Sequence, residues 1–124
     1  MVVQNNIEKK VIAFLKTVVP AEWKVFGEIP ESRPDQYILV ERTGGPSDMI
    51  GRVEEPELII SFTHKTSQQI ASDMAIATDI KIVRDLKAIN EISRVQRLSL
   101  VRLDDLVTKE RRYQGYYSIV HHLT

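Results

Sequence analysis

The sequence predicts a single α+β domain in which two helices pack against a mainly antiparallel or mixed β-sheet. Two segments carry apolar residues at helical spacing, and five carry the β-branched, aromatic and aliphatic residues that are typical of strands. Their order along the chain is α-β-β-β-α-β-β, which is characteristic of an α+β sandwich. The chain has 124 residues, a common size for one domain and enough for a hydrophobic core without disulfides. We therefore treat residues 1–124 as one domain.

The first helix is predicted from five apolar residues at helical spacing: Ile7, Val11, Phe14, Leu15 and Val18. Asn5 or Asn6 can cap its first turn, because a short side-chain oxygen accepts hydrogen bonds from the free amides there. Pro20 ends it.

Three strands are predicted next. The first covers residues 22–29 around Trp23, and a turn over residues 31–34 separates it from the second, residues 36–43. The second strand and the third, residues 58–63, are apolar on both faces at their centres, which is typical of interior strands.

Residues 44–55 are predicted to form the one long loop of the chain. They contain three of the five glycines, which would give the loop freedom to adapt to a surface. Loops of about twelve residues in a compact domain are usually functional or disordered. We expect this flexible loop to be mobile in the isolated protein and to become ordered on assembly, with Met49, Ile50 and Val53 contacting the partner.

The second helix is predicted to run from a cap at Thr66 or Ser67 to about Leu86. Its apolar residues fall on two sides. One side holds Ala71, Ala75, Ile82, Val83 and Leu86, and the roughly opposite side holds Ile70, Met74 and Ala77. A small domain with one sheet has little to cover the second side, so we expect it to face outward and contact a partner.

Two more strands, residues 93–103 and 112–123, complete the predicted sheet. The polar turn between them begins with Asp104 and Asp105. In the last strand four residues share one side at period two: Tyr113, Tyr117, Ile119 and Leu123.

The bulk composition excludes several classes of protein. Cysteine is absent, which excludes disulfides and thiolate metal sites, and 17 basic residues balance 17 acidic ones. We therefore expect no general attraction to DNA or anionic lipid. No signal peptide or membrane-spanning segment is apparent, so we expect a protein that folds in the cytoplasm and contacts no membrane.

The second half of the chain is nevertheless basic. Most of the excess lies in six residues: Arg94, Arg97, Arg102, Lys109, Arg111 and Arg112. A solvated strand face and loop is the favoured interpretation, and contact with nucleic acid or an acidic protein ring is the alternative.

A search for catalytic, metal-binding and cofactor-binding residues predicts none. His121 and His122 are neighbours in a strand, so their side chains should point to opposite faces, and His64 is expected at the surface. No serine lies in a Gly-x-Ser-x-Gly elbow, and the glycines of residues 44–51 form no phosphate loop. Asp104 and Asp105 are interpreted as solvated turn residues. We therefore expect no enzyme activity.

One stretch of the sequence suggests a family. PESRPDQYILVERTGG, residues 30–45, resembles the central motif of bacteriophage tail terminator proteins of long-tailed phages, in which a Pro-x-x-Arg-Pro turn leads into a strand that ends in x-Arg-x-Gly-Gly. The resemblance continues through the strand at residues 58–63, the long helix, an acidic turn with a threonine, and the pair Arg112-Tyr113. The turn over residues 104–110 lacks the proline and glycine often found in relatives.

The resemblance implies a minor tail protein, encoded by a phage or prophage, that caps the finished tail tube as a hexameric ring without a cofactor. The ring would end tube growth and offer a surface for head attachment, so the implied partners are other copies of the chain, the tube protein and a head-completion protein. The virion tail, assembled in the bacterial cytoplasm, would be its location. The expected interface residues are Arg42, Gly44, Gly45, Met49, Ile50, Val53, Ile70, Met74 and Ala77. The inner face, along the path of the genome, is expected to hold Arg94, Arg97, Arg102, Arg111 and Arg112.

Three alternatives remain open from the sequence. Another phage neck or head–tail completion protein would share the fold and join a different ring. A small nucleic-acid-binding module would use the arginines of the last hairpin together with Tyr113, Tyr116 and Tyr117. An enzyme would need a convergent polar pocket.

Overall fold

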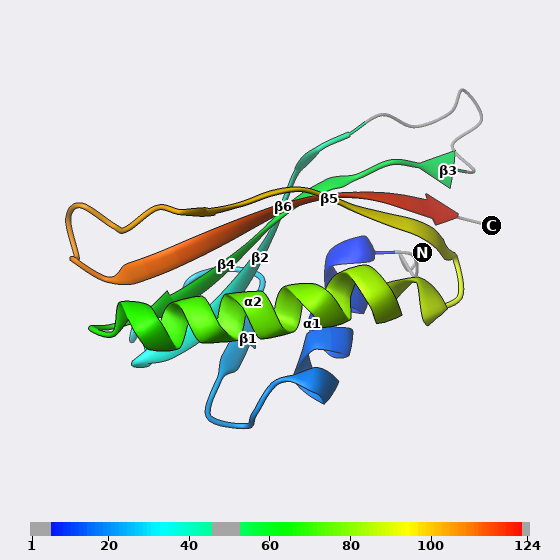
Figure 1. The fold of residues 1–124 in the computed structure, drawn as a ribbon. Helices are drawn as coiled ribbons and strands as arrows, with labels where there is room; N and C mark the ends of the chain where they lie inside the picture. The colour runs from blue at the N-terminus through cyan, green and yellow to red at the C-terminus, as the bar shows by residue number, and fades with distance from the viewer. Residues whose placement is uncertain (1–5, 46–52, 123–124) are drawn as a thin grey trace.

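The computed structural model describes residues 6–45 and 53–122, and within them it confirms the predicted α+β fold (Figure 1). The elements follow the predicted order, with one additional two-residue strand and a short 3-10 helix. Their bounds are α1 (Ile7–Val18), β1 (Lys24–Phe26), β2 (Gln36–Gly44), β3 (Val53–Glu54), β4 (Glu57–His64), α2 (Gln68–Asp85), η1 (Leu86–Ala88), β5 (Ile92–Arg102) and β6 (Arg111–His122).

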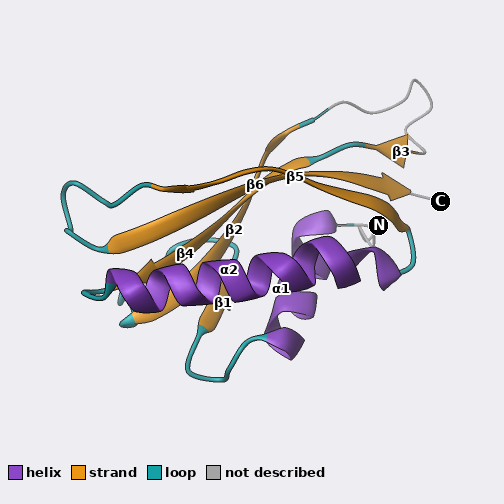
Figure 2. Ribbon diagram, viewed as in Figure 1, coloured by secondary structure: helices purple, strands orange, loops and turns teal. Residues whose placement is uncertain are grey.

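The six strands form one mixed sheet around β6. The order β1-β2-β4-β6 is extended on the other side of β6 by β5, and the short β3 pairs with the end of β6. β1 runs parallel to β2, and the remaining pairs are antiparallel. Both helices lie on one face of this sheet (Figure 2). The opposite face is called the open face below.

The core lies between the helices and the sheet. From the strands come Ile38, Val40, Leu58, Ile60, Phe62, Tyr117 and Ile119, and from the helices come Ile7, Val11, Leu15, Ala75 and Ile82. Burial of each large side chain of this kind contributes roughly 1.5–3 kcal/mol. The alternation predicted for the last strand is confirmed at Tyr117 and Ile119, which are fully buried.

The helix boundaries confirm two of the predicted caps. The side chain of Asn6 accepts a hydrogen bond from the Lys9 amide at 3.0 Å, and the hydroxyl of Ser67 accepts one from the Ile70 amide at 3.1 Å. Each satisfies an amide that the first turn of a helix leaves without a partner.

The first strand and the long loop differ from the prediction. β1 has only three residues, because its pairing with β2 covers only Lys24 to Phe26. The predicted loop of residues 44–55 is shortened, because Val53 and Glu54 pair with His122 and His121 as β3. Met49 and Ile50 lie outside the described residues.

Gly44, the last residue of β2, and Gly45 after it are needed for their backbone geometry. Gly44 and Gly45 have φ angles of 143° and 114°, and a Cβ on Gly45 would lie 2.1 Å from the carbonyl oxygen of Glu55. Glycine here permits a close approach of two backbone segments, in addition to the freedom expected from the sequence.

β5 forms an irregular edge of the sheet. Its register with β6 shifts between Ile92 and Arg94 and again between Arg97 and Ser99. Bulges and charged side chains on an edge strand hinder the addition of a further strand.

Candidate functional site

The residues of α2 that are exposed to solvent differ in part from those predicted from the sequence. Ile70 is 43% exposed and Ala77 is exposed, as expected, but Met74 is half-buried and packs against the core, so the prediction that it faces outward is wrong. The most exposed isoleucines of α2 are instead Ile76 and Ile80, at 52% and 55%.

The positions of the buried α2 residues explain this correction. Ala71, Thr78 and Ile82 are buried, and Met74 stands one turn from Ala71 and Thr78 along the flank of the same face. The Thr78 hydroxyl lies 3.2 Å from the Met74 sulfur, which holds the thioether against the helix. Ile76 and Ile80, four residues apart, form the exposed apolar stripe.

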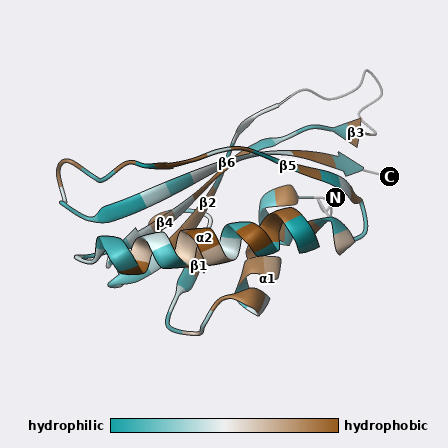
Figure 3. Cartoon of the chain, in the orientation of Figure 1, coloured by the Kyte–Doolittle hydropathy of each residue, from teal (hydrophilic) through white to brown (hydrophobic). Residues whose placement is uncertain are grey.

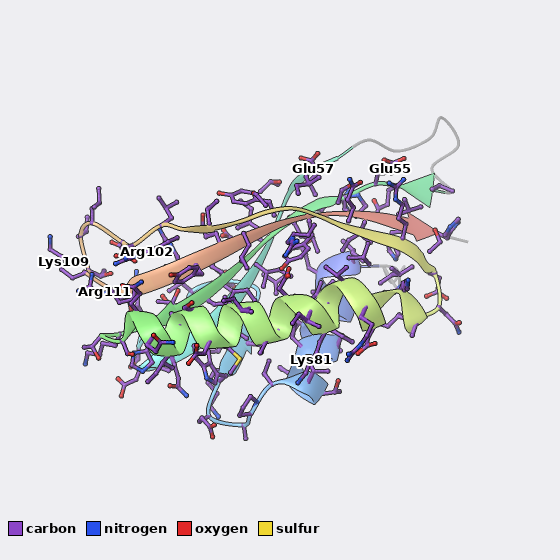
Figure 4. All side chains as sticks on the ribbon, in the orientation of Figure 1. Glu55, Glu57, Lys81, Arg102, Lys109 and Arg111 are labelled. Carbon is purple, nitrogen blue, oxygen red and sulfur yellow. The ribbon has the colours of Figure 1, made fainter. Side chains whose placement is uncertain are left out.

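A second exposed apolar group lies at the turn between β5 and β6, here called the hairpin tip (residues 103–109). Leu106 and Val107 are 85% and 90% exposed, and Leu103 is 49% exposed. Figure 3 shows hydrophobic colouring in the turn at the far end of the β5–β6 hairpin, and Figure 4 shows Arg102, Lys109 and Arg111 around this turn. Two adjacent aliphatic side chains this exposed bring a monomer no stability.

Hydrogen bonds hold the hairpin tip in one conformation. The Asp105 carboxylate accepts from the amides of Val107 and Thr108, both at 2.9 Å. Lys109, which has a positive φ of 66°, donates its amide to the Asp105 carbonyl at 3.0 Å. The predicted solvated turn is therefore an ordered turn in which Asp105 satisfies backbone donors.

Glu110 anchors the hairpin tip to the first half of the chain. Its carboxylate is nearly buried and accepts hydrogen bonds from Arg33 at 2.7 Å, Thr108 at 3.1 Å and Tyr37 at 3.3 Å. Burial of the Tyr37 ring and the nearby Glu110 raise the pKa of Tyr37, so its hydroxyl keeps the proton that it donates. The arginine of the Pro-x-x-Arg-Pro turn thus positions the tip from 77 residues away.

Arg42, the second arginine of the motif, belongs to a network of hydrogen-bonded side chains at one end of the sheet. Arg42 donates to Glu54 at 2.9 Å, Glu54 lies 2.8 Å from Nδ1 of the fully buried His121, and Nε2 of His121 lies 2.8 Å from the Lys10 ammonium. Lys10 also pairs with Glu91 at 2.9 Å. Burial alone would raise the pKa of Glu54, but hydrogen bonds from His121 and Arg42 outweigh it and lower the pKa.

This hydrogen-bond network fixes the tautomer of His121, since the Lys10 ammonium group can only donate. Nε2 must therefore accept from Lys10, and Nδ1 must carry the proton that is donated to Glu54. We predict that nitrogen-15 NMR at neutral pH finds Nδ1 protonated and Nε2 unprotonated. Lys10→Met removes the donor to Nε2 and is expected to admit the other tautomer. A wild-type ring protonated at Nε2 would contradict this assignment.

The lowered pKa of Glu54 gives the network a pH dependence of known sign. Its contribution to stability is complete above the ordinary carboxyl pKa of about 4.5 and is lost as pH falls through the lowered value.

The five arginines expected along a lumen do not share one face. The strand register places Arg97, Arg102 and Arg111 on the helix side, and Arg94 and Arg112 on the open face. Four of them pair with aspartates: Arg97 with Asp79, Arg102 and Arg111 with Asp104, and Arg112, more distantly, with Asp105. Hydrogen bonds, chiefly from Arg102, lower the pKa of Asp104 to about 2, so the pairs of Asp104 with Arg102 and Arg111 persist well into acid.

A buried polar group joins α2 to β5 and β6. Asp79 accepts hydrogen bonds from the Tyr117 hydroxyl and from Arg97, both at 2.7 Å. The Tyr117 ring lies against Gly115, where a Cβ would stand 2.6 Å from the ring and the hydroxyl oxygen. Burial, and then the hydrogen bond to Asp79, raises the pKa of Tyr117, which keeps the hydroxyl protonated.

At the other edge of the sheet, a hollow of about 320 Å³ lies between the end of α1 and β1. It is here called the α1–β1 hollow, and its lining is Lys16, Val19, Pro20, Ala21, Trp23, Lys24, Val25 and Phe26. Trp23 and Val25 are nearly buried and form its apolar base. Nothing in the sequence signals this hollow, because it depends on how α1 meets the sheet.

The histidines lie as the sequence predicts for the final strand. His121 is buried and His122 is half-buried, and their register partners place them on opposite faces. His64 is half-buried, and its Nδ1 accepts from the amides of Thr66 and Ser67 just before α2. Among residues 6–45 and 53–122, no group of three or more His, Asp or Glu residues could hold a metal ion.

No protein-family model matches the chain, and no curated protein matches it at a significant level of similarity. In the part of the chain that the structure describes, neither helix is long and apolar enough to cross a lipid bilayer.

Proposed function

We propose that this chain is a structural assembly protein that caps a phage tail tube as a ring and presents the head-attachment surface. The proposed partners are further copies of the chain, the tube protein and a head-completion protein. The proposed location is the head-proximal end of the tail, after assembly in the bacterial host.

The observation that carries this proposal is the presence of exposed aliphatic side chains on rigidly held elements. Ile76 and Ile80 stand on a regular helix, and Leu106 and Val107 stand on a turn fixed by Asp105 and anchored through Glu110. Interfaces between proteins bury apolar side chains of this kind. The more specific proposal, that the assembly is a tail-terminator ring, is supported only by the resemblance of residues 30–45.

The arginine pairs favour an assembly protein over a nucleic-acid-binding module. Attraction to phosphates depends on cations that neutralise them. Arg97, Arg102 and Arg111 are within 3.3 Å of their own carboxylates, so much of their charge is already compensated.

Tails isolated from the phage or prophage that encodes the chain test the proposal. Loss of the gene is expected to give tubes of irregular, extended length without heads, as seen by electron microscopy. Headless tails of normal length would instead support the alternative of a neck or head-completion protein.

A matched pair of variants tests the α2 surface. Ile80→Glu is expected to reproduce the loss of capping while leaving the fold intact, because a half-exposed position tolerates charge but an interface does not. Ile29→Glu makes the same change at a 45% exposed isoleucine outside α2 and is expected to cap normally. Normal capping by Ile80→Glu would exclude this stripe from the interface.

A further inference from the structure

We propose that the hairpin tip of one copy docks in the α1–β1 hollow of a second copy, with Leu106 and Val107 as the inserted side chains. The inference deepens the proposed function, since it names the contact that would close the ring. It rests on two surfaces of this chain, an exposed aliphatic turn and a hollow with nearly buried apolar side chains in its lining.

The hairpin tip has the properties of an inserted group. Leu106 and Val107 are the two most exposed large apolar residues among those described, at 85% and 90%. Their backbone is fixed by the Asp105 side chain and by the Lys109 amide. A group ordered before it binds loses little conformational freedom on docking.

The anchoring of Glu110 strengthens this argument. Arg33 and Tyr37, both distant in sequence, converge on its carboxylate and hold the base of the tip. A buried carboxylate is costly to desolvate, so it persists only with good partners. Here those partners stabilise a turn whose outermost side chains contact almost nothing in their own chain.

The α1–β1 hollow has the properties of a receptor. Its volume of about 320 Å³ corresponds to roughly ten water molecules at about 30 Å³ each. Val19, Pro20 and Phe26 give it apolar walls above the nearly buried base. The apolar part of this hollow is stabilised when aliphatic side chains cover it, because they remove it from water.

The two surfaces lie at opposite edges of the sheet. The hollow adjoins β1, the first strand of the order, and the tip joins β6 to the edge strand β5. One chain therefore cannot bring them together, whereas two copies packed head to tail can. Contacts between unlike surfaces of identical subunits close into rings when the rotation permits.

Charged residues near the two surfaces do not account for the contact. Asp104 and Asp105, about a quarter exposed, lie in the tip but are paired with Arg102, Arg111 and Arg112 of their own chain. Lys16 and Lys24 line the rim of the hollow, so the aliphatic side chains carry the contact. The bulges and arginines of β5 hinder the simpler alternative, direct pairing of sheet edges. Side-chain insertion is consequently the favoured mode of contact.

The absence of cysteine from the sequence permits a direct test. Val107→Cys protein is mixed with Ala21→Cys protein at millimolar concentration and oxidised, and the mixed disulfide dimer is quantified. We expect it to form about tenfold faster than in the control mixture of Val107→Cys with Gln69→Cys, because docking raises the effective concentration of the paired thiols. Gln69 is exposed on α2, away from the hollow.

A second variant separates docking from random collision. Leu106→Asp, added to the Val107→Cys chain, is expected to reduce the rate with Ala21→Cys to that of the control, while circular dichroism shows an unchanged fold. Equal rates in the Ala21→Cys and Gln69→Cys mixtures would overturn the contact.

The tail assay distinguishes failure of the contact from failure of the proposed function. If cross-linking fails while loss of the gene still gives uncapped tubes, the capping function stands and the ring closes elsewhere. If cross-linking succeeds while tails are normal without the gene, the contact stands and the capping function is wrong.

Discussion

Asp79→Ala is expected to lower the free energy of unfolding by about 3 kcal/mol, the lower part of the range for breaking a buried charged pair. The carboxylate is buried and accepts from the Tyr117 hydroxyl and from Arg97. Its removal leaves the fully buried hydroxyl without a partner, whereas Arg97, about half exposed, can turn to water. Urea unfolding followed by tryptophan fluorescence measures the change, since Trp23 lies in the core.

A double-mutant cycle with Tyr117→Phe isolates the cause. Tyr117→Phe alone is expected to cost about 1–2 kcal/mol, because Asp79 keeps its contact with Arg97. The double variant is expected to lose less than the sum of the two single losses, since no unpaired hydroxyl remains. Additive losses would contradict the assigned hydrogen bond.

Glu110→Ala is expected to cost about 2–3 kcal/mol and, in addition, to release the hairpin tip. The change deprives Arg33, Tyr37 and Thr108 of their common acceptor, and the nearly buried Tyr37 hydroxyl keeps only its hydrogen bond with Thr63. Hydrogen exchange of the amides of residues 103–109 is expected to accelerate. Tail capping is expected to fail, although no residue of the proposed contact has been changed.

Glu110→Gln provides the matched control. Its amide keeps an oxygen that can accept from Tyr37 but loses the charge that pairs with Arg33. We expect an intermediate loss of stability and an intermediate rate of exchange. An unchanged tip in Glu110→Ala would show that Asp105 alone orders the turn.

Local signals account for the parts of the fold that the sequence predicts. Both helices are confirmed with their caps at Asn6 and Ser67, because capping depends on residues three positions apart. The strands at residues 36–43 and 58–63 are confirmed, with β2 and β4 each slightly longer, because continuous apolar runs require an interior position.

The features that the sequence does not predict depend on distant partners. β3 forms because Val53 and Glu54 pair with His122 and His121 at the end of β6, about 67 residues further along the chain. The bulges of β5 likewise appear only in its register with β6. The outward side of α2 is set by how the helix crosses the sheet, which explains the exchange of Met74 for Ile76 and Ile80 as the exposed residues.

For the motif residues, too, the sequence predicts local features but not contacts with distant residues. Their order suggests a family, but the pairing of Arg33 with Glu110 and of Arg42 with Glu54 is visible only in three dimensions. The interface roles expected for Arg42, Gly44, Gly45 and Val53 remain predictions. In this structure Arg42 is engaged within its own chain, Gly44 adopts a positive φ, and Gly45 also permits a close backbone approach.

The irregular edge strand affects how the chain behaves at high concentration. A long, flat edge would act as a template for fibre growth whenever newly made chains accumulate. The two register shifts of β5, with Arg94 and Arg97 beside them, remove that template. Concentrated stocks are therefore expected to stay dispersed without forming cross-β aggregates. If the chain caps a tail tube as proposed, an infected cell holds a reserve of dispersed chains that assemble only on a finished tube.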